Sequence, residues 1–284
     1  MATKDSTEWL KERAAKAQLE IARTSAQEAK TAQLPLWPDA VRAVPNALLR
    51  GALFSISNVR EVVKKRTLLA SVKGIEVRFK GERLNQTDLD TWETIVHLAR
   101  MQDLGTKVEF SAHSMLALLG RHRGKEQHEQ LKEDISRLTG AVVEITLKDQ
   151  GQAFGGTLVQ SYYRDEEKQA YVIEVSPQLL KLYQAGNTYI DWDERQQLGN
   201  ANLAKWLHGF YSTHAVQLPY KVATIRDLCG AKATQRLGDF RKLLRTALDL
   251  LVAKETSIIG WKIDENDCVV VVRRASKSQQ KYVG

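Results

Sequence analysis

Residues 224–254 decide the fold of this chain, and they read TIRDLCGAKATQRLGDFRKLLRTALDLLVAK. Thr224 can cap a short helix that ends at Gly230, because threonine caps helix N-termini and glycine ends helices. After a turn that carries Lys232, apolar residues recur at helical spacing and predict a longer helix from about Gln235 to Lys254. Two helices joined by a tight turn are typical of a helix-turn-helix unit.

Two strands are predicted after that helix, and the segment Asp264-Glu265-Asn266-Asp267 forms the turn between them. Leu203, Trp206, Leu207 and Phe210 predict a further helix before residue 224. Helix, turn, helix and β-hairpin make up the winged-helix arrangement, whose second helix enters the major groove of DNA. The C-terminal part of the chain is therefore predicted to read DNA.

The same order occurs once earlier in the chain. Ser111 can cap a short helix that stops at Gly120, residues 121–124 form a basic turn, and a helix is predicted from Lys125 to Thr139. A preceding helix is expected over residues 88–104. Strands near 141–148, 153–163 and 170–175 are expected to form one wing sheet, a hairpin over 66–80 turns at Lys73-Gly74, and a helix over 176–186 connects the two copies.

The predicted fold is α+β, with tandem winged-helix domains preceded by a helical and extended N-terminal arm. We expect the arm and its linker at 1–45, the first domain at 46–187, the second at 188–273 and a basic tail at 274–284. The arm is expected to be helical from Asp5 to Lys30, and residues 33–45 carry three of the five prolines, which favours an extended linker.

The charge distribution points to a polyanionic partner. The chain has 284 residues and a net charge of +8, and residues 1–40 hold as many acidic as basic groups, so the whole excess lies after residue 40. Residues 219–254 hold eight basic and three acidic groups, and residues 273–284 hold four basic groups and no acid. Charge gathered around the predicted reading helix suits phosphate neutralisation with counterion release. A generally solvated basic surface is the alternative.

The outward face of the 235–254 helix supplies the candidate DNA contacts. Gln235 and Arg236 carry paired donors or acceptors that match adenine and guanine, and Asp239 can accept from a cytosine amine. The remaining candidates hold phosphate or flank the helix in the turn, the wing and the tail: Lys232, Lys242, Arg245, Lys262, Arg273 and Arg274. A solvated face with charge pairs between neighbouring turns is the alternative.

The corresponding helix of the first copy is acidic. Glu126, Glu129, Glu133 and Asp134 lie on its predicted outer face, so it is not expected to read DNA deeply. DNA contacts of this copy are instead expected from Arg121, Arg123 and Lys125 at the turn. A second copy of the protein is the competing partner for that surface.

The linker contains a short peptide with its own chemistry, Gln33-Leu34-Pro35-Leu36-Trp37. A glutamine amide, spaced leucines and a terminal aromatic resemble the motif by which proteins dock into the apolar pocket of the bacterial sliding clamp. Leu36 and Trp37 would fill the pocket, and Gln33 would hydrogen-bond at its rim. Trp37 stands where this motif has phenylalanine, and Pro35 where it has a small polar residue. The alternative is that Leu34, Leu36 and Trp37 fold back on the domain.

Together these features resemble the TrfA family, the replication initiators of broad-host-range IncP-type plasmids, in their shorter form. The resemblance runs along essentially the whole chain and is carried by residues 33–37, 88–92 and 224–254. It implies binding of direct repeats (iterons) at a plasmid origin, opening of an adjacent AT-rich element, and contact with the host helicase, initiator and sliding clamp. It also implies that monomers are active, whereas dimerisation through the first winged-helix domain restrains initiation.

The residues themselves predict a basic DNA reader with two modules. Binding to an array of repeats would deform the DNA and help to unpair a flexible neighbouring segment. Basic and aromatic side chains would then hold the exposed single strand. A transcriptional repressor built from the same modules is the alternative, and the clamp-like peptide argues against it.

Catalysis is not expected. A nicking enzyme would need a tyrosine beside paired histidines, but His208 and His214, which flank Tyr211, are six residues apart on a predicted helix and do not share a face. The chain has no Gly-rich loop ending in Gly-Lys-Ser/Thr and no cysteine–histidine spacing that suits zinc, so neither a metal nor another cofactor is expected.

A cytoplasmic protein of a bacterial host is expected. No apolar run approaches the roughly 18 residues of a membrane span, and the N-terminus has no signal-peptide pattern. The two cysteines, Cys229 and Cys268, lie among apolar neighbours and do not make a disulfide framework.

Overall fold

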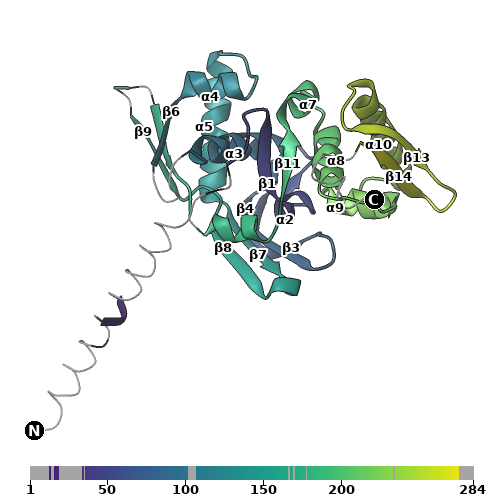
Figure 1. Ribbon diagram of the computed structural model, residues 1–284, viewed down its shortest axis with the longest axis horizontal. Helices are drawn as coiled ribbons and strands as arrows, with labels where there is room; N and C mark the ends of the chain where they lie inside the picture. Colours follow the sequence, from purple (N-terminus) through teal and green to yellow (C-terminus); the bar gives the residue numbers. More distant parts are fainter. Residues whose placement is uncertain are drawn as a thin grey trace, which may run out of the picture.

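The computed structural model describes residues 13, 16–18, 34, 36–101, 107–165, 167–168, 170–176, 178–232 and 234–274. Residues 13 and 16–18 are helical. The rest of the predicted arm helix, and the predicted tail beyond Arg274, lie outside the described residues. The described elements are built around two hydrophobic cores (Figure 1).

The first winged-helix order, called here the first unit, runs from α3 to β10. Its elements are α3 (Gln86–Ala99), β6 (Lys107–Ser111), α4 (Ala112–Leu118), α5 (Lys125–Gly140), β9 (Ser161–Asp165) and β10 (Ala170–Glu174). The strands form an antiparallel sheet in the order β6-β10-β9.

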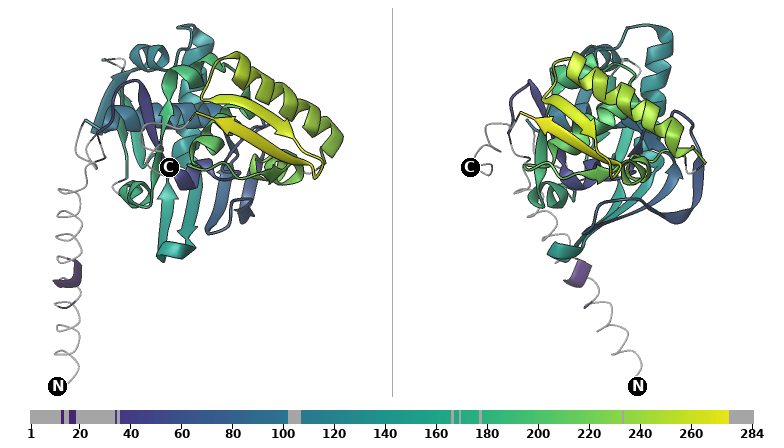
Figure 2. Two further views of the ribbon diagram at one scale, coloured as in Figure 1. Left: turned by 45° about the vertical axis from the view of Figure 1, so that its right-hand side comes forward. Right: turned by 90° about the vertical axis from the view of Figure 1, so that its right-hand side faces the viewer.

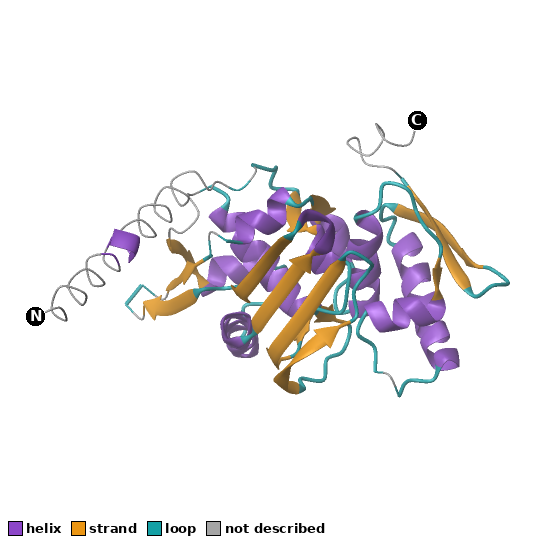
Figure 3. Cartoon of the chain, turned by 90° about the horizontal axis from the view of Figure 1, so that it is seen from below, coloured by secondary structure: helices purple, strands orange, loops and turns teal. Residues whose placement is uncertain are grey.

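The second unit runs from α8 to β14. Its elements are α8 (Asn202–Ser212), β12 (Tyr220–Lys221), α9 (Val222–Leu228), α10 (Leu237–Ala253), β13 (Ile258–Ile263) and β14 (Cys268–Arg273). Its sheet has the order β12-β14-β13, in which the last strand again lies between the other two. Both units therefore share one topology, and their sheets lie at opposite ends of the molecule (Figures 1 and 3).

The prediction that these strands of the first unit form a single wing sheet is wrong. A hairpin of β7 (Val142–Leu147) and β8 (Gln152–Thr157) is inserted between α5 and β9. It joins the predicted hairpin of β3 (Val62–Leu69) and β4 (Ile75–Glu82) in a separate four-stranded antiparallel sheet, β3-β4-β7-β8. The physical reason is that β7 is apolar on one face only and finds its partner in β4, far away in sequence, with Val77 opposite Ile145.

The remaining elements connect the units. They are β1 (Val41–Pro45), α2 (Asn46–Leu49), β2 (Phe54–Ser55), β5 (Leu84–Asn85), the single 3₁₀ turn η1 (Lys148–Gln150), α6 (Leu179–Gln184), β11 (Asn187–Asp191) and α7 (Trp192–Gln197). Strands β1 and β11 pair along their whole length, and β2 pairs with β5 in parallel. The C-terminal part of the predicted linker, residues 41–45, is therefore a strand of the folded body.

Local signals set several helix ends, but the predicted cap Thr224 is wrong, because α9 begins at Val222 with Lys221 as its N-cap and Thr224 lies inside the helix. Ser111 Oγ accepts from Ser114 N at 3.0 Å and caps α4, as predicted. Gly120 and Gly230 have φ of 64° and 67°, the left-handed geometry that lets glycine end α4 and α9. Helix α3 begins at Gln86, not Asp88, because the capping residue is Asn85: its side chain accepts from Thr87 N, and Asp88 accepts from Asn85 N.

Candidate nucleic-acid interface

Helix α10 is held by one apolar face. Phe240, Leu244, Leu248 and Leu251 recur every three or four residues and are buried in the second core, which also contains Trp206 and Phe210 of α8. The β13–β14 hairpin lies beside α10 along its length (Figure 2). The opposite face of α10 is left to solvent.

That exposed face carries most of the predicted contact residues. Lys232, Arg236, Asp239, Lys242 and Arg245 are exposed, as is Lys262 on β13, and Gln235 is half-buried. None of the five cations in this set forms an ion pair with another residue that the structure describes. Unpaired cations on one face are available to neutralise phosphate.

The predicted start of the reading helix is wrong by two residues. Helix α10 begins at Leu237, and Arg236 is its N-cap, with φ −60° and ψ 137°. Gln235 lies in the preceding turn, where its backbone N donates to Lys232 O at 2.9 Å. Both side chains therefore approach from the segment before the helix. They remain at its N-terminal end, which in this motif faces the base edges.

The wing turn is tied to the same end of α10. Arg241 Nε and Nη2 donate to Asp267 Oδ1 and Oδ2, both at 2.9 Å, and this bond lowers the pKa of the Asp267 carboxyl. Asp264 Oδ1 closes the turn by accepting from Asn266 N and Cys268 N. Arg241 is not among the predicted contact residues, although an acidic turn after a basic helix is a signal for this ion pair. We call the α10 N-terminus, residues 229–236 and the wing turn 264–267 the reading end.

Arg273 and Arg274, which are predicted DNA contacts just past the wing, lie away from the reading end. Both lie at the other end of β14 from the wing turn, because β14 runs from Cys268 to Arg273. Arg273 is partly buried, with Nε donating to Ser257 Oγ at 3.1 Å. Arg274 Nη2 donates to the carbonyl oxygens of Glu255 and Thr256 at 3.0 Å. They stabilise the turn that follows α10.

In the first unit, Arg121 is likewise used inside the protein. Its Nη1 donates to Asp134 Oδ2 at 2.8 Å, and its Nη2 to Thr91 Oγ1 at 3.2 Å. Asp134 is fully buried and also accepts from Arg137 Nη2. The expected outward position of Asp134 is therefore wrong, because Asp134 is buried and pairs with Arg121. The DNA contact of Arg121 stays a prediction, and this ion pair opposes it.

The rest of the first turn and helix matches the expected surface. Arg123 and Lys125 are exposed, and so are Glu126, Glu129 and Glu133. Glu129 accepts from Lys132 Nζ at 2.8 Å. The outward face of α5 thus carries three carboxylates, which repel a DNA backbone, and its two free cations stand at its N-terminal end.

The clamp-like peptide does not lie in an exposed linker. Leu34 and Trp37 are 3% and 5% exposed and belong to the first core, whereas Leu36 is 74% exposed. Gln33 lies outside the described residues. The alternative stated above, that the peptide folds back on the domain, therefore holds for Leu34 and Trp37 in this conformation and not for Leu36.

Trp37 makes ring, hydrogen-bond and cation contacts within the first core. Its ring stacks on Tyr183 with an interplanar angle of 10°, and its Nε1 donates to His97 Nδ1 at 3.0 Å. Arg100 lies over the ring and donates its Nε to Trp37 O. Burial, with the neighbouring Arg42 and Arg100, lowers the pKa of His97 to about 4, so its neutral Nδ1 is free to accept.

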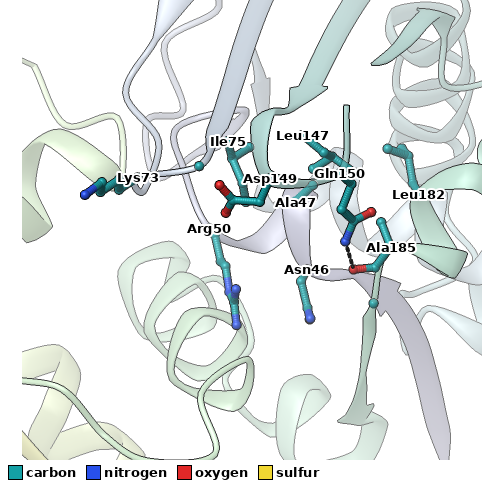
Figure 4. A pocket seen from close by; sticks show the side chains of 12 residues that line it. Asn46, Ala47, Arg50, Lys73, Ile75, Leu147, Asp149, Gln150, Leu182 and Ala185 are labelled. Atoms are coloured by element: carbon teal, nitrogen blue, oxygen red, sulfur yellow. Dashed lines mark hydrogen bonds between the residues drawn. The ribbon is translucent and has the colours of Figure 1, made fainter. Parts of the chain in front are cut away.

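A small cavity lies between the two sheet turns and α6 (Figure 4). Asn46, Arg50, Lys73 and Asp149 line it, so its charges are mixed. Arg50 donates to Thr213 O and Oγ1, and Gln150 Nε2 donates to Ala185 O. These contacts join structural elements and suggest no ligand.

The next two statements hold for the described residues alone. No group of three or more His, Cys, Asp or Glu side chains there is arranged to hold a metal ion. Within the same residues, every helix is too short or too polar to cross a bilayer.

Comparisons with known proteins agree with this architecture. The family model described as TrfA protein matches residues 2–274. The plasmid replication initiator protein TrfA of Escherichia coli is 24% identical over 253 residues, which are 84% of this chain and 65% of that protein. The RepFIB replication protein A of Salmonella typhi is 28% identical over 162 residues, 49% of this chain and 50% of that protein.

Among solved structures, domains 2 and 3 of RctB superpose with a TM-score of 0.53 at 12% identity, covering 82% of this chain and 98% of theirs. That likeness concerns the fold alone. The match to the family model over nearly the whole length shows that the chain belongs to the TrfA protein family.

Proposed function

We propose that this chain is a plasmid replication initiator that binds direct repeats (iterons) at its origin through both units. The observation that carries the proposal is the reading end of the second unit, where unpaired cations stand beside Gln235 and Asp239. Gln235 and Arg236 would contact bases, Asp239 would accept from a cytosine amine, and Lys232, Lys242, Arg245 and Lys262 would contact phosphates. Its membership of a family with a curated plasmid replication initiator supports this.

The first unit would add weaker contacts to DNA. Arg123 and Lys125 are its candidates, since the carboxylates of α5 exclude a deep approach. Deforming the DNA over several repeats would favour unpairing of a flexible AT-rich neighbour, and the protein would need no catalytic step or cofactor. Binding of the exposed single strand and recruitment of the host helicase and initiator belong to the same proposal.

Docking on the host sliding clamp through residues 33–37 would require a rearrangement. Leu36 is accessible, but Leu34 and Trp37 must leave the first core before they can fill a pocket on a partner. Self-association through the first unit is the remaining part of the proposal. The edge strands β3 and β8 of the separate four-stranded sheet, which packs on α5, support that route, because an unpaired edge can add a strand from a second copy.

A nuclease footprint on the DNA that flanks the gene, repeated at two salt concentrations, tests the DNA-binding proposal. Periodic protection over direct repeats that survives the higher salt is expected. A single palindromic footprint over a promoter would favour a repressor instead. Diffuse protection that vanishes with salt would mean that the charge binds phosphate without reading sequence.

Two variants separate base from phosphate contacts at the reading end. Arg236→Ala is expected to cost about 1–3 kcal/mol and to relax specificity at one base pair. Lys242→Ala should weaken all sequences alike and reduce the salt dependence by about one phosphate. Equal loss of specificity in both variants would contradict the assigned roles.

A further inference from the structure

A buried ionic cluster joins the two units. Arg195 of α7 is 1% exposed, and its Nε donates to Asp90 Oδ1 at 2.6 Å. Its Nη2 donates to Gln86 Oε1 at 3.1 Å and its Nη1 to Lys205 O at 3.3 Å. One guanidinium therefore binds α3 of the first unit and α8 of the second.

Asp90 completes the connection from its other oxygen. Its Oδ2 accepts from Lys205 Nζ of α8 at 2.6 Å, and both side chains are 11% exposed. Glu93, one turn further along α3, has Oε2 3.4 Å from Arg195 Nε. A buried charge keeps its hydrogen bonds only in one geometry, because losing a partner leaves it desolvated and unpaired. The planar fork of arginine makes that geometry narrow.

The two joined helices are those against which α5 and α10 pack. Helix α5 packs on α3, where Arg137 Nε donates to Asp88 Oδ1 and Thr91 Oγ1 donates to Asp134 Oδ2. Helix α10 packs on α8 in the second core. One path from α5 to α10 therefore runs through α3, the Arg195 cluster and α8, beside other contacts such as Trp206 Nε1 with Gly51 O. A change at Arg195 would alter the relative position of the α5 N-terminus, with Arg123 and Lys125, and of α10, without touching the DNA-facing side chains.

We propose that Arg195 is a positioning residue that sets the separation of the two DNA-contacting surfaces, so that both units engage one repeat in a fixed spacing. This inference rests on the proposed function. The physical basis is that two linked binding modules gain affinity only if their geometry lets both engage at once, and a rigid link also rejects targets of the wrong spacing. Arg195 thereby contributes to specificity without contacting a base.

The test uses the full chain and DNA duplexes that carry one repeat. Zero, one, two or three base pairs are inserted between the two groove segments that the two units are expected to contact. For the unaltered protein, one inserted base pair is expected to weaken binding by about tenfold or more, because the second contact is lost. Arg195→Lys keeps the charge and loses the fork. We expect it to weaken binding to the native repeat about three- to tenfold. We call the dissociation constant for an inserted repeat divided by that for the native repeat the spacing ratio, and we expect the variant to bring this ratio close to one.

Arg78→Lys is the matched control, because Arg78 is a partly exposed arginine on β4 whose ion pair with Glu76 stays within one strand. It should leave the spacing ratio unchanged. A lost cap or a loosened core would lower affinity for every duplex by the same factor, so only the ratio reports positioning. If Arg195→Lys does not fold, Lys205→Gln replaces it, since that variant removes one of the two ties to Asp90 and leaves the Arg195 bonds in place.

The outcomes are distinguishable. A spacing ratio in the variants equal to that of the unaltered protein overturns the positioning role and leaves repeat binding intact. An unaltered protein that protects only one groove, or that binds all spacings equally, overturns the two-unit part of the proposed function itself.

Discussion

Replacing Trp37 by alanine should destabilise the fold strongly, although the residue lies in a segment whose sequence is typical of a linker. The side chain is 5% exposed and loses its stacking on Tyr183 and its bond to His97 Nδ1 in the variant. Large-to-small changes at buried tryptophans cost about 3–5 kcal/mol. His97 Nδ1 still lies 3.1 Å from Arg42 Nη1, so no acceptor is orphaned and we add no further penalty.

Leu36→Ala is the matched control. Its side chain is 74% exposed, one residue away, so its free energy of unfolding should change by no more than about 0.5 kcal/mol. Urea unfolding followed by circular dichroism measures both variants, and hydrogen exchange in α3 and α6 locates the loss. A cost below about 1 kcal/mol for Trp37→Ala would refute the reasoning, because Trp37 would then not be held in the core in solution.

The same pair of variants bears on clamp docking. If residues 33–37 bind a sliding clamp, a free peptide of residues 31–40 should bind at least about tenfold more tightly than the intact chain, because the chain must first release Trp37. Leu36→Ala should then weaken docking without a loss of stability. Equal affinity of peptide and chain would show that burial imposes no barrier, and no binding of the peptide would remove clamp docking altogether.

Three further predictions follow from the described contacts. Burial raises the pKa of Glu93 from its usual 4.5 to about 7, with Arg195, Arg42 and Lys205 opposing the rise and Asp90 adding to it. Protonation thus favours the folded state, a contribution fully present below pH 4.5 and lost as the pH rises through about 7. The stability of Glu93→Gln relative to the unaltered protein should therefore rise by about 2–3 kcal/mol between pH 4.5 and 8, and a constant difference in thermal melts would contradict this. Gly230→Ala should cost about 1–3 kcal/mol, because φ is 67° and the new Cβ would lie 2.8 Å from Ser55 Cβ, whereas Gly238→Ala, with open space around its Cβ, should be neutral or stabilising in the same melts. Arg274→Ala should leave base specificity in a binding-site selection unchanged, since its guanidinium caps backbone carbonyls after α10, and a changed consensus would restore it to the interface.

Much of the architecture is readable from local sequence. The 3.6-residue spacing of Phe240, Leu244 and Leu248 defines the buried face of α10, and the glycines at 120 and 230 end the helices before the two turns. These signals act within a few residues, so they survive without knowledge of the rest of the fold. They are sufficient to predict the two successive helix-turn-helix units and the cationic face of the second one.

The polar residues of α3 also recur at helical spacing. Gln86, Asp90, Glu93, His97 and Arg100 recur every three or four residues on that helix, between the apolar positions, and all five are buried. A polar stripe at helical spacing is usually a solvated face. Here it is covered by residues 37–42 on one side and by α7 and α8 on the other, which no local pattern indicates.

The sequence by itself thus determined the two helix-turn-helix repeats, the Ser111 cap of α4 and the sign of the charge on the reading helix. Only the tertiary structure decided which charges remain available. Arg121 and Arg273 read as DNA contacts in sequence but donate inside the protein, and Trp37 read as part of an extended linker but fills the first core. The physical reason is that helix periodicity is set by neighbours three or four residues away, whereas a charge is paired or free according to partners such as Asp90 and Arg195, which are 105 residues apart in the chain.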